Sequence, residues 1–154
     1  MIRNKLQELL EIVGTEEKKA EKRMVETKNA ANEIARTSAN SPSQSGDREH
    51  SRNQAYLVEE SYNNIKIFKE KLSKELLLEV PKKSRPICLI GIEYETGESM
   101  ELVLANQTAF VEGFVVVTTA SPLGRELVGK KVGDSFEFES GGGVRAKGVI
   151  KELE

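Results

Sequence analysis

Five side chains that could do chemistry lie together in one short polar stretch of the sequence. Asp47, Glu49 and His50 fall within four residues, and Arg48 and Arg52 are interleaved with them. Such a stretch would present carboxylates, an imidazole and guanidinium groups to whatever molecule it meets. An ordinary polar turn, with His50 as a surface residue without a task, is the alternative interpretation.

The segment 41–53 that carries these residues interrupts two long helical patterns. Pro42 disfavours the α conformation at Ser41, and Gly46 can adopt a positive φ, so the first helix should end here. The segment is therefore predicted to form a turn at the far tip of a helical hairpin. The remainder of the protein would serve to deliver this tip.

Apolar residues on both sides of the tip recur at helical spacing. In the first arm they alternate at four and three residues, which is the seam of a coiled coil. Glu17 and Thr27 fall on that seam and Gly14 lies beside it, which favours an intramolecular hairpin of modest stability. The seam of the first arm consists of Leu6, Leu10, Val13, Glu17, Ala20, Met24, Thr27, Ala31 and Ile34. The facing stripe of the second arm consists of Ala55, Val58, Tyr62, Ile65, Phe68, Leu72 and Leu76, in a helix predicted to continue to Val80.

The composition excludes several classes of protein. The chain has 154 residues, 38% hydrophobic and 31% charged, with a formal net charge of -2, which argues against binding naked nucleic acid through bulk electrostatics. No apolar run is long enough to cross a membrane. Cys88 lies in an apolar run and is predicted to be a buried, reduced thiol, as in a reducing compartment. We therefore expect a soluble, cytoplasmic, monomeric protein without a membrane partner.

The composition changes near Val80, which predicts two domains. Residues 1–80 would form the antiparallel coiled-coil hairpin, and the basic segment 81–86 would be a linker. Residues 87–154 contain short β-rich runs punctuated by glycines and one short helix with Ser121 as its cap and Gly129 at its end. The predicted class is α+β, with a small antiparallel sheet in the second domain. Its expected core is Ile90, Ile92, Leu102, Leu104, Val115, Val117, Leu127, Phe136, Phe138 and Val149.

The run TASPLGRELVGKKVGDSFEFESGGGVRAKGVIKEL, from 119 to 153 in the sequence, resembles the C-terminal domain of the GreA/GreB family of bacterial transcript-cleavage factors. The arm-tip-arm pattern with Ser-Gly-Asp at its turn is similar to that family's N-terminal coiled coil. The resemblance implies an FKBP-like sheet domain that docks on the rim of the RNA polymerase secondary channel. The hairpin would then reach down the channel to the active centre and the nascent RNA 3′ end.

The resemblance also implies a role for the tip. Asp47 and Glu49 would help hold a second Mg²⁺, shared with the polymerase active site, that supports cleavage of backtracked RNA; the chain alone would bind no cofactor and be no enzyme. Family members place a second carboxylate three residues after the Asp, whereas this sequence has His50 there and its nearest acid, Glu49, at two. Neutral His is a poor Mg²⁺ ligand. The alternative is therefore a channel-binding regulator that does not stimulate cleavage.

Contacts with polymerase or RNA are expected from two groups of residues. They are Arg48, His50 and Arg52 at the tip, and Ser121, Pro122, Leu123 and Gly124 at the start of the short helix. For the second group, simple packing of the helix start is the competing interpretation. Two other functions agree less well with the sequence. A peptidyl-prolyl isomerase of the FKBP type would need an aromatic-lined pocket, for which 5% aromatics and no Trp are unfavourable. A coiled-coil dimerisation module would need a seam that continues past Pro42 and Gly46.

Overall fold

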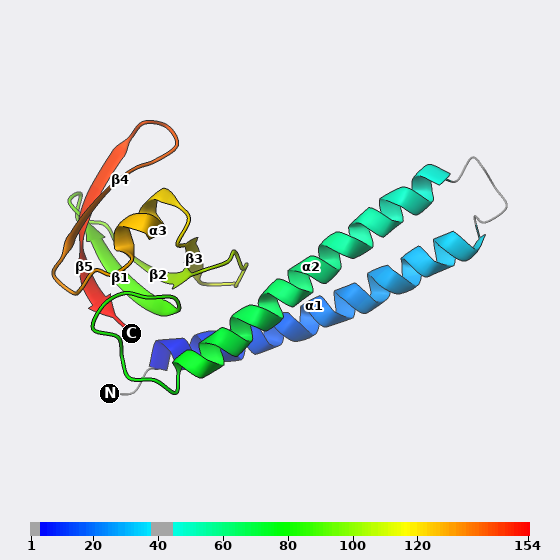
Figure 1. Cartoon of the computed structure of the whole chain (residues 1–154), viewed down its shortest axis with the longest axis horizontal. Coiled ribbons are helices and arrows are strands. Elements are labelled where there is room, and N and C mark those ends of the chain that lie inside the picture. Colours follow the sequence, from blue (N-terminus) through cyan, green and yellow to red (C-terminus); the bar gives the residue numbers. More distant parts are fainter. Residues whose placement is uncertain (1–3, 38–44) are drawn as a thin grey trace.

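A long helical hairpin projects from a small sheet domain (Figure 1). The computed structural model describes residues 4–37 and 45–154. Helices α1 (Asn4–Thr37) and α2 (Ser45–Glu75) run antiparallel, and the sheet domain follows. The start of α1 and the C-terminal end of β5 lie near the base of the hairpin, and the end of α1 and the start of α2 lie at the opposite extreme of the described chain. The α+β class and the hairpin within one chain are confirmed.

Helix α2 ends five residues earlier than its apolar stripe predicts. Its last residue is Glu75, after which Leu77 N–H donates to the Lys74 carbonyl and Leu78 N–H to the Glu75 carbonyl, both as tighter i to i−3 turns. Leu77 and Leu78 are consequently 87% and 54% exposed. The extension to Val80 was therefore wrong, because the chain tightens and turns before Pro81 is reached.

The sheet has five strands in the order β3-β2-β1-β5-β4. The strands are β1 (Cys88–Tyr94), β2 (Ser99–Ala105), β3 (Val115–Thr118), β4 (Ser135–Glu139) and β5 (Arg145–Leu153). Three of the four pairings are antiparallel, whereas β3 runs parallel to β2. The sheet is therefore mixed, although a purely antiparallel sheet was predicted. The segment 106–114 carries the chain back to Leu102 in the middle of β2, so that β3 runs in the same direction as β2. Helix α3 (Pro122–Leu127) follows β3.

Strand β1 and the second half of β2 are buried on both faces of the sheet. Successive residues of a strand point to opposite sides of the sheet, so the even-numbered and odd-numbered residues of β1 and β2 enter different cores. The even set, with Cys88, Ile90 and Leu104, packs with Leu127 of α3 and Phe136. The odd set, with Leu89 and Val103, packs against the hairpin. Burial on both faces explains the continuous apolar sequence of these strands.

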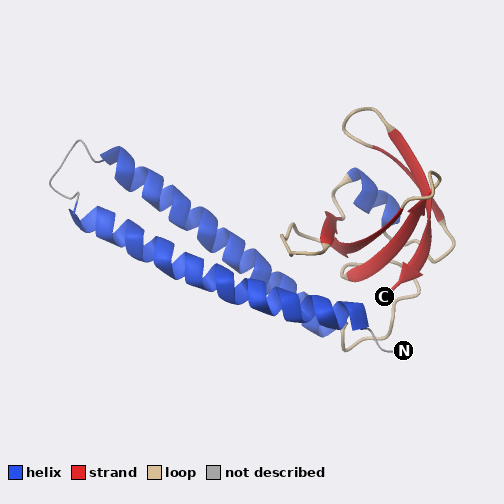
Figure 2. Ribbon diagram, turned by 180° about the vertical axis from the view of Figure 1, so that it is seen from behind, coloured by secondary structure: helices blue, strands red, loops and turns tan. Residues whose placement is uncertain are grey.

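The base of the hairpin and the sheet share one core. Leu6, Leu9 and Val13 of α1 and Phe68 and Leu72 of α2 lie in the same buried cluster as the odd-numbered strand residues. A two-helix rod cannot bury these side chains by itself, so the sheet provides the missing surface. Figure 2 shows the sheet curled over this end of the hairpin, with the other end of the hairpin free of it.

The basic segment 81–86, predicted as a linker, is held from both sides. The Ser84 hydroxyl donates to the Leu127 carbonyl at the end of α3 and accepts from Lys130 N–H at 3.1 Å. The Arg85 guanidinium donates to Glu75 Oε1 at 2.8 Å, at the end of α2. The segment therefore ties α2 to α3, which should limit independent movement of the hairpin and the sheet domain.

The predicted core of the sheet domain is largely confirmed, with two exceptions. Val149 is half-buried and lies outside both buried clusters, because the neighbouring Ile150 is the β5 residue that enters the core. Val115 is 48% exposed, although it was expected to face inward. It begins the four-residue edge strand β3, which has a partner strand on one side only. Cys88 is fully buried and forms no disulfide, as predicted.

Candidate functional site at the hairpin tip

The chemically interesting residues at 46–52 lie in the first two turns of α2. The sequence predicted a turn over 41–53, but residues 45–53 are helical, and Gly46 belongs to the helix instead of forming a left-handed turn. Residues 41–44, with Pro42, lie outside the described part of the chain. Helix α2 can begin so early because Ser45 and Asp47 are residue types that favour a helix start.

Helical geometry separates the two predicted metal ligands. Successive helical positions are about 100° apart around the axis, so positions 47 and 49 differ by about 200° and positions 47 and 50 by about 60°. Glu49 and His50 are exposed, and Arg48 is half-buried; the side chain of Asp47 is outside the described residues. The helix thus places position 50, not position 49, on the same face as position 47.

The tip alone offers few donors for a cation. Among the described residues, no group of three or more His, Cys, Asp or Glu side chains is placed to hold a metal ion. Two carboxylates on different helix faces could each donate to an ion, but they could not enclose it. These residues are therefore suited to adding one carboxylate ligand to an ion whose other ligands come from another molecule.

Each residue of the second predicted contact group except Pro122 has a structural role. The Ser121 hydroxyl caps α3, accepting from Gly124 N–H at 3.0 Å and donating to the Thr118 carbonyl at 2.7 Å. Leu123 is buried. A Cβ on Gly124 would lie 1.8 Å from the Thr118 carbonyl oxygen, so only glycine fits there. Pro122 is exposed at the first helical position and remains available for contact.

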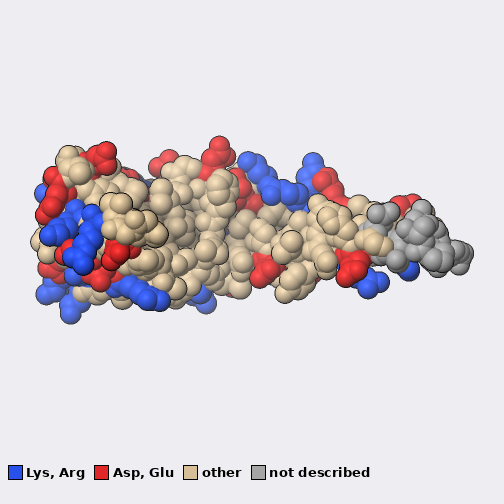
Figure 3. Space-filling view, turned by 90° about the horizontal axis from the view of Figure 1, so that it is seen from above, with Lys and Arg blue, Asp and Glu red and all other residues tan. Residues whose placement is uncertain are grey.

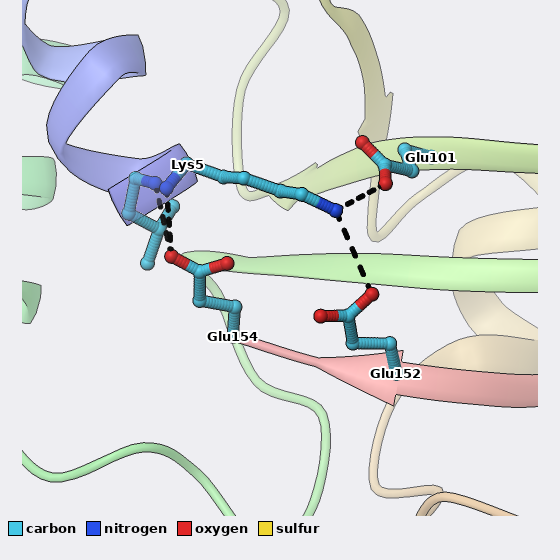
Figure 4. A network of polar contacts seen from close by, with 5 residues as sticks. Lys5, Glu101, Glu152 and Glu154 are labelled. Carbon is cyan, nitrogen blue, oxygen red and sulfur yellow. Dashed lines mark hydrogen bonds and ion pairs between the residues drawn. The ribbon is translucent and has the colours of Figure 1, made fainter. Parts of the chain in front are cut away.

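Helix α1 is capped by a residue from the opposite end of the chain, which the sequence did not indicate. Glu154 Oε1 accepts from the backbone N–H groups of Lys5 at 2.9 Å and Leu6 at 3.3 Å (Figure 4). The first turn of α1 contains no acidic residue of its own. A carboxylate at this position satisfies two unpaired donors and complements the positive end of the helix dipole.

The Lys5 side chain extends this network to the sheet. Its Nζ donates to Glu101 of β2 and lies 3.6 Å from Glu152 Oε2 of β5. The hydrogen bond to Glu101 raises the pKa of Lys5 above its ordinary value, and the negative charges of Glu101 and Glu152 act in the same direction. Lys5 therefore stays charged and joins the hairpin to β2 and β5, the two strands that flank β1 in the sheet.

Charged side chains of both signs are distributed along the visible face of the hairpin (Figure 3). Acidic and basic residues alternate there without one sign dominating, in agreement with the net charge of -2. This surface has no extended basic stripe of the kind that binds nucleic acid without a partner.

Comparison with known proteins identifies the sheet domain. Residues 85–154 match the family model described as transcription elongation factor, GreA/GreB, C-terminal. These residues belong to the GreA/GreB family. The resemblance seen in the sequence is thereby confirmed, and the match covers the sheet domain together with Arg85 and Pro86. No curated protein matches the chain in a sequence search.

Solved structures of similar proteins include transcription factor Gfh1 and a GreA/GreB factor. One Gfh1 structure is 15% identical and covers 95% of this chain and 93% of its own, with a TM-score of 0.39. Gfh1 of Thermus thermophilus is 16% identical, with 94% of each chain covered and a TM-score of 0.38. The GreA/GreB elongation factor from Nitrosomonas europaea is 19% identical over 58% of this chain and 78% of its own, with a TM-score of 0.38.

In the described ranges 4–37 and 45–154, no helix is long and apolar enough to cross a membrane.

Proposed function

We propose that this GreA/GreB-type chain is a transcription elongation factor that binds in the RNA polymerase secondary channel and stimulates the polymerase's own cleavage of backtracked RNA. The observation that carries the proposal is the match of residues 85–154 to the elongation-factor family, attached to a hairpin of 34- and 31-residue helices. At about 1.5 Å per residue the hairpin spans roughly 45 to 50 Å, enough to reach deep into a channel while the sheet domain stays outside.

The tip would contribute carboxylate oxygens at the far end of this reach. Together with the polymerase's first metal ion, a bound second Mg²⁺ would help to activate water and to stabilise the leaving oxygen. Asp47 would donate one ligand to that ion, and Glu49 would add negative charge from the opposite side of α2. His50 and the guanidinium groups of Arg48 and Arg52 would contact the RNA or polymerase around the site. The factor has no activity of its own in this scheme, because the reacting groups belong to the polymerase.

A non-cleaving regulator is the second candidate, and one observation favours it. Positions 47 and 49 face different sides of α2, and the position on the same face as 47 is occupied by His50, a poor ligand for Mg²⁺. A factor that occupies the channel with a single well-placed carboxylate would block it without completing the metal site. The two candidates share docking and differ only in the chemistry of the tip.

Backtracked elongation complexes separate the two candidates. RNA length is measured after incubation with and without the protein, and the parent chain is expected to shorten the RNA. Asp47→Asn should retain polymerase binding but lose stimulated cleavage, Glu49→Gln should lose part of it, and His50→Ala less still. Glu26→Gln, an exposed charge removed elsewhere on the hairpin, is the matched control and should cleave like the parent.

The outcomes are distinct. A parent chain that binds polymerase without shortening the RNA would establish the regulator. An Asp47→Asn variant that cleaves as well as the parent would refute the role of that carboxylate.

The sheet domain is expected to supply the docking contact through the exposed Pro122. A Pro122→Glu substitution keeps a residue type suited to the first turn of a helix, so α3 should remain folded. Polymerase binding should weaken by about ten-fold or more if a buried contact is lost. Binding equal to that of the parent would remove Pro122 from the docking surface.

A further inference from the structure

We propose that the segment 78–85 and the end of α3 form a second docking surface for RNA polymerase, which takes an acidic segment of the polymerase that also carries apolar side chains. The choice of partner rests on the proposed function, whereas the shape and charge of the surface are properties of this chain. The segment is part of the loop between α2 and β1, at the base of the molecule and far from the tip (Figure 1). It would therefore stay outside the channel when the hairpin is inserted.

Two Lys-Lys pairs from distant parts of the sequence border an open hollow, which we call the basic hollow. Its lining consists of residues 78–85 and Gly129. The pair Lys82-Lys83 belongs to the lining itself, and the pair Lys130-Lys131 directly follows Gly129. The tertiary structure thus gathers four lysines that the sequence separates.

Ser84 holds the two lysine pairs together. Its N–H donates to the Lys130 carbonyl at 2.8 Å, and its hydroxyl accepts from Lys130 N–H at 3.1 Å. Its carbonyl accepts from Gly129 N–H at 2.9 Å. Ser84 is 2% exposed, and a buried hydrogen-bonded junction is costly to open. The two lysine pairs therefore keep a fixed position relative to each other.

The positive charges of the basic hollow are available to a partner. Three of its lysines are exposed and Lys130 is half-buried. In the described ranges 4–37 and 45–154, none of the four takes part in an ion pair. Arg85, by contrast, is bound to Glu75 Oε1 at 2.8 Å and so serves the fold itself.

Two carboxylates reduce the positive charge of the basic hollow without cancelling it. Glu79 lines the hollow, and Asp134 Oδ2 accepts from Lys131 N–H at 2.9 Å. The four ammonium groups outnumber these two carboxylates, and the excess positive charge attracts a segment rich in Asp or Glu.

Large apolar side chains are exposed among the lysines. Leu78 in the lining is 54% exposed, and Val128 and Val132, which precede and follow the second lysine pair, are 43% and 56% exposed. An exposed apolar patch bordered by polar residues is typical of a protein interaction site. Leu78 is exposed because α2 ends at Glu75 and the chain turns there.

This combination favours a protein over a nucleic acid as the partner. Phosphate groups would pair with the lysines but would leave the leucine and valine side chains in water. An amphipathic protein segment covers both, since its carboxylates meet the lysines and its apolar side chains meet Leu78 and the valines. The occupant is therefore an acidic, amphipathic protein segment and not the RNA or DNA of the complex.

Charged and apolar contacts of this kind act on different rate constants. Long-range attraction by the lysines speeds association and weakens as salt screens it, over a Debye length of about 10 Å at 0.1 M and about 4 Å at 0.5 M. Burial of apolar side chains slows dissociation and depends little on salt. The lysines and the apolar residues can therefore be tested separately.

Surface plasmon resonance on core polymerase without nucleic acid measures both rate constants. Lys83→Glu or Lys131→Glu should lower the association rate constant about three-fold at about 0.1 M salt, and the double reversal about ten-fold. At about 0.5 M salt these losses should fall below about two-fold. Lys147→Glu is the matched control, because it reverses an exposed lysine of β5 that lies outside the hollow, and it should associate like the parent.

Leu78→Ser should raise the dissociation rate constant about three- to ten-fold at both salt concentrations. Val144→Ser is its control, because Val144 is 65% exposed and follows the turn between β4 and β5. Carbodiimide coupling joins lysine amines to carboxylates in direct contact, so the coupled polymerase peptide should carry an Asp or Glu linked to one of the four lysines. A melting curve for each variant shows that it is folded.

Rate constants equal to those of the parent in the lysine and Leu78 variants would overturn the inference and leave the proposed function intact. A loss seen only when RNA and DNA fill the polymerase would assign the lysines to phosphates and rule out the protein partner. Association slowed equally at both salt concentrations would indicate a structural role of the lysines and would also contradict the inference. A parent chain that does not bind core polymerase would refute the proposed function itself and exclude the polymerase as the occupant.

Discussion

Removing the Glu154 side chain should destabilise the base of the hairpin, although the residue is 149 positions from the helix that it caps. In a Glu154→Ala variant the N–H groups of Lys5 and Leu6 lose their acceptor, which costs about 1 kcal/mol for a lost cap. The loss of a carboxylate at the positive end of the helix dipole adds roughly 0.5 to 1 kcal/mol. Glu154 is 8% exposed as a residue, so water replaces these contacts poorly. We therefore expect a loss of about 2 kcal/mol.

Urea unfolding monitored by circular dichroism measures this loss. The expected loss corresponds to a fall in melting temperature of about 4 to 8 °C for a chain of this size. Glu154→Gln keeps an acceptor and removes the charge, so it should lose about half as much. Glu152→Ala is the matched control, because its side chain is 54% exposed and its carboxylate lies 3.6 Å from Lys5 Nζ; it should change stability by less than about 0.5 kcal/mol.

The reasoning would be refuted if Glu154→Ala and Glu152→Ala were equally stable. Equal losses for Glu154→Ala and Glu154→Gln would instead assign the whole effect to charge and remove the capping contribution.

Three further changes test other parts of the fold. Gly124→Ala should destabilise the sheet domain by about 2 kcal/mol or more, measured by urea unfolding, because its Cβ would meet the Thr118 carbonyl; a neutral result would contradict the close approach. Phe68→Ala should cost about 3 to 5 kcal/mol and lower hydrogen-exchange protection in the hairpin base and β1 together, since both share its core; protection lost in the hairpin alone would disprove a shared core. Glu101 raises the pKa of Lys5 in the folded state, so the contribution of Lys5 to the free energy of unfolding is complete below pH 10.5 and is lost as the pH rises above it. The stabilities of the parent and Lys5→Met should therefore converge above pH 10.5, and a difference that stays constant with pH would contradict the linkage.

The sequence by itself determined the secondary structure and the order of the parts. Apolar residues at helical spacing on either side of Pro42 sufficed for the hairpin, because amphipathic periodicity is a local property. The cap at Ser121 and the left-handed Gly129, with φ of 79°, were likewise local and were found at the predicted places. The family of residues 85–154 also followed from sequence, through a run of specific residues.

The tip could be predicted only in part. The sequence located the acidic and basic residues correctly but assigned them to a turn, because Gly46 and the polar neighbours are typical of both turns and helix starts. The structure continues α2 back to Ser45, and this decides which side chains share a face. The separation of positions 47 and 49 is therefore a consequence of backbone conformation that residue types alone did not reveal.

Only the tertiary structure decided how the two halves are joined. The cap from Glu154 on α1, the tie from Ser84 to the end of α3, and the core shared by Phe68 and Leu89 all link residues far apart in the chain. Such contacts leave no periodic signal, because each depends on where two independently predicted elements meet in space. The parallel pairing of β3 with β2 arose in the same way, from the path of the connection between them. Local patterns thus specified the elements, and long-range packing specified their directions and partners.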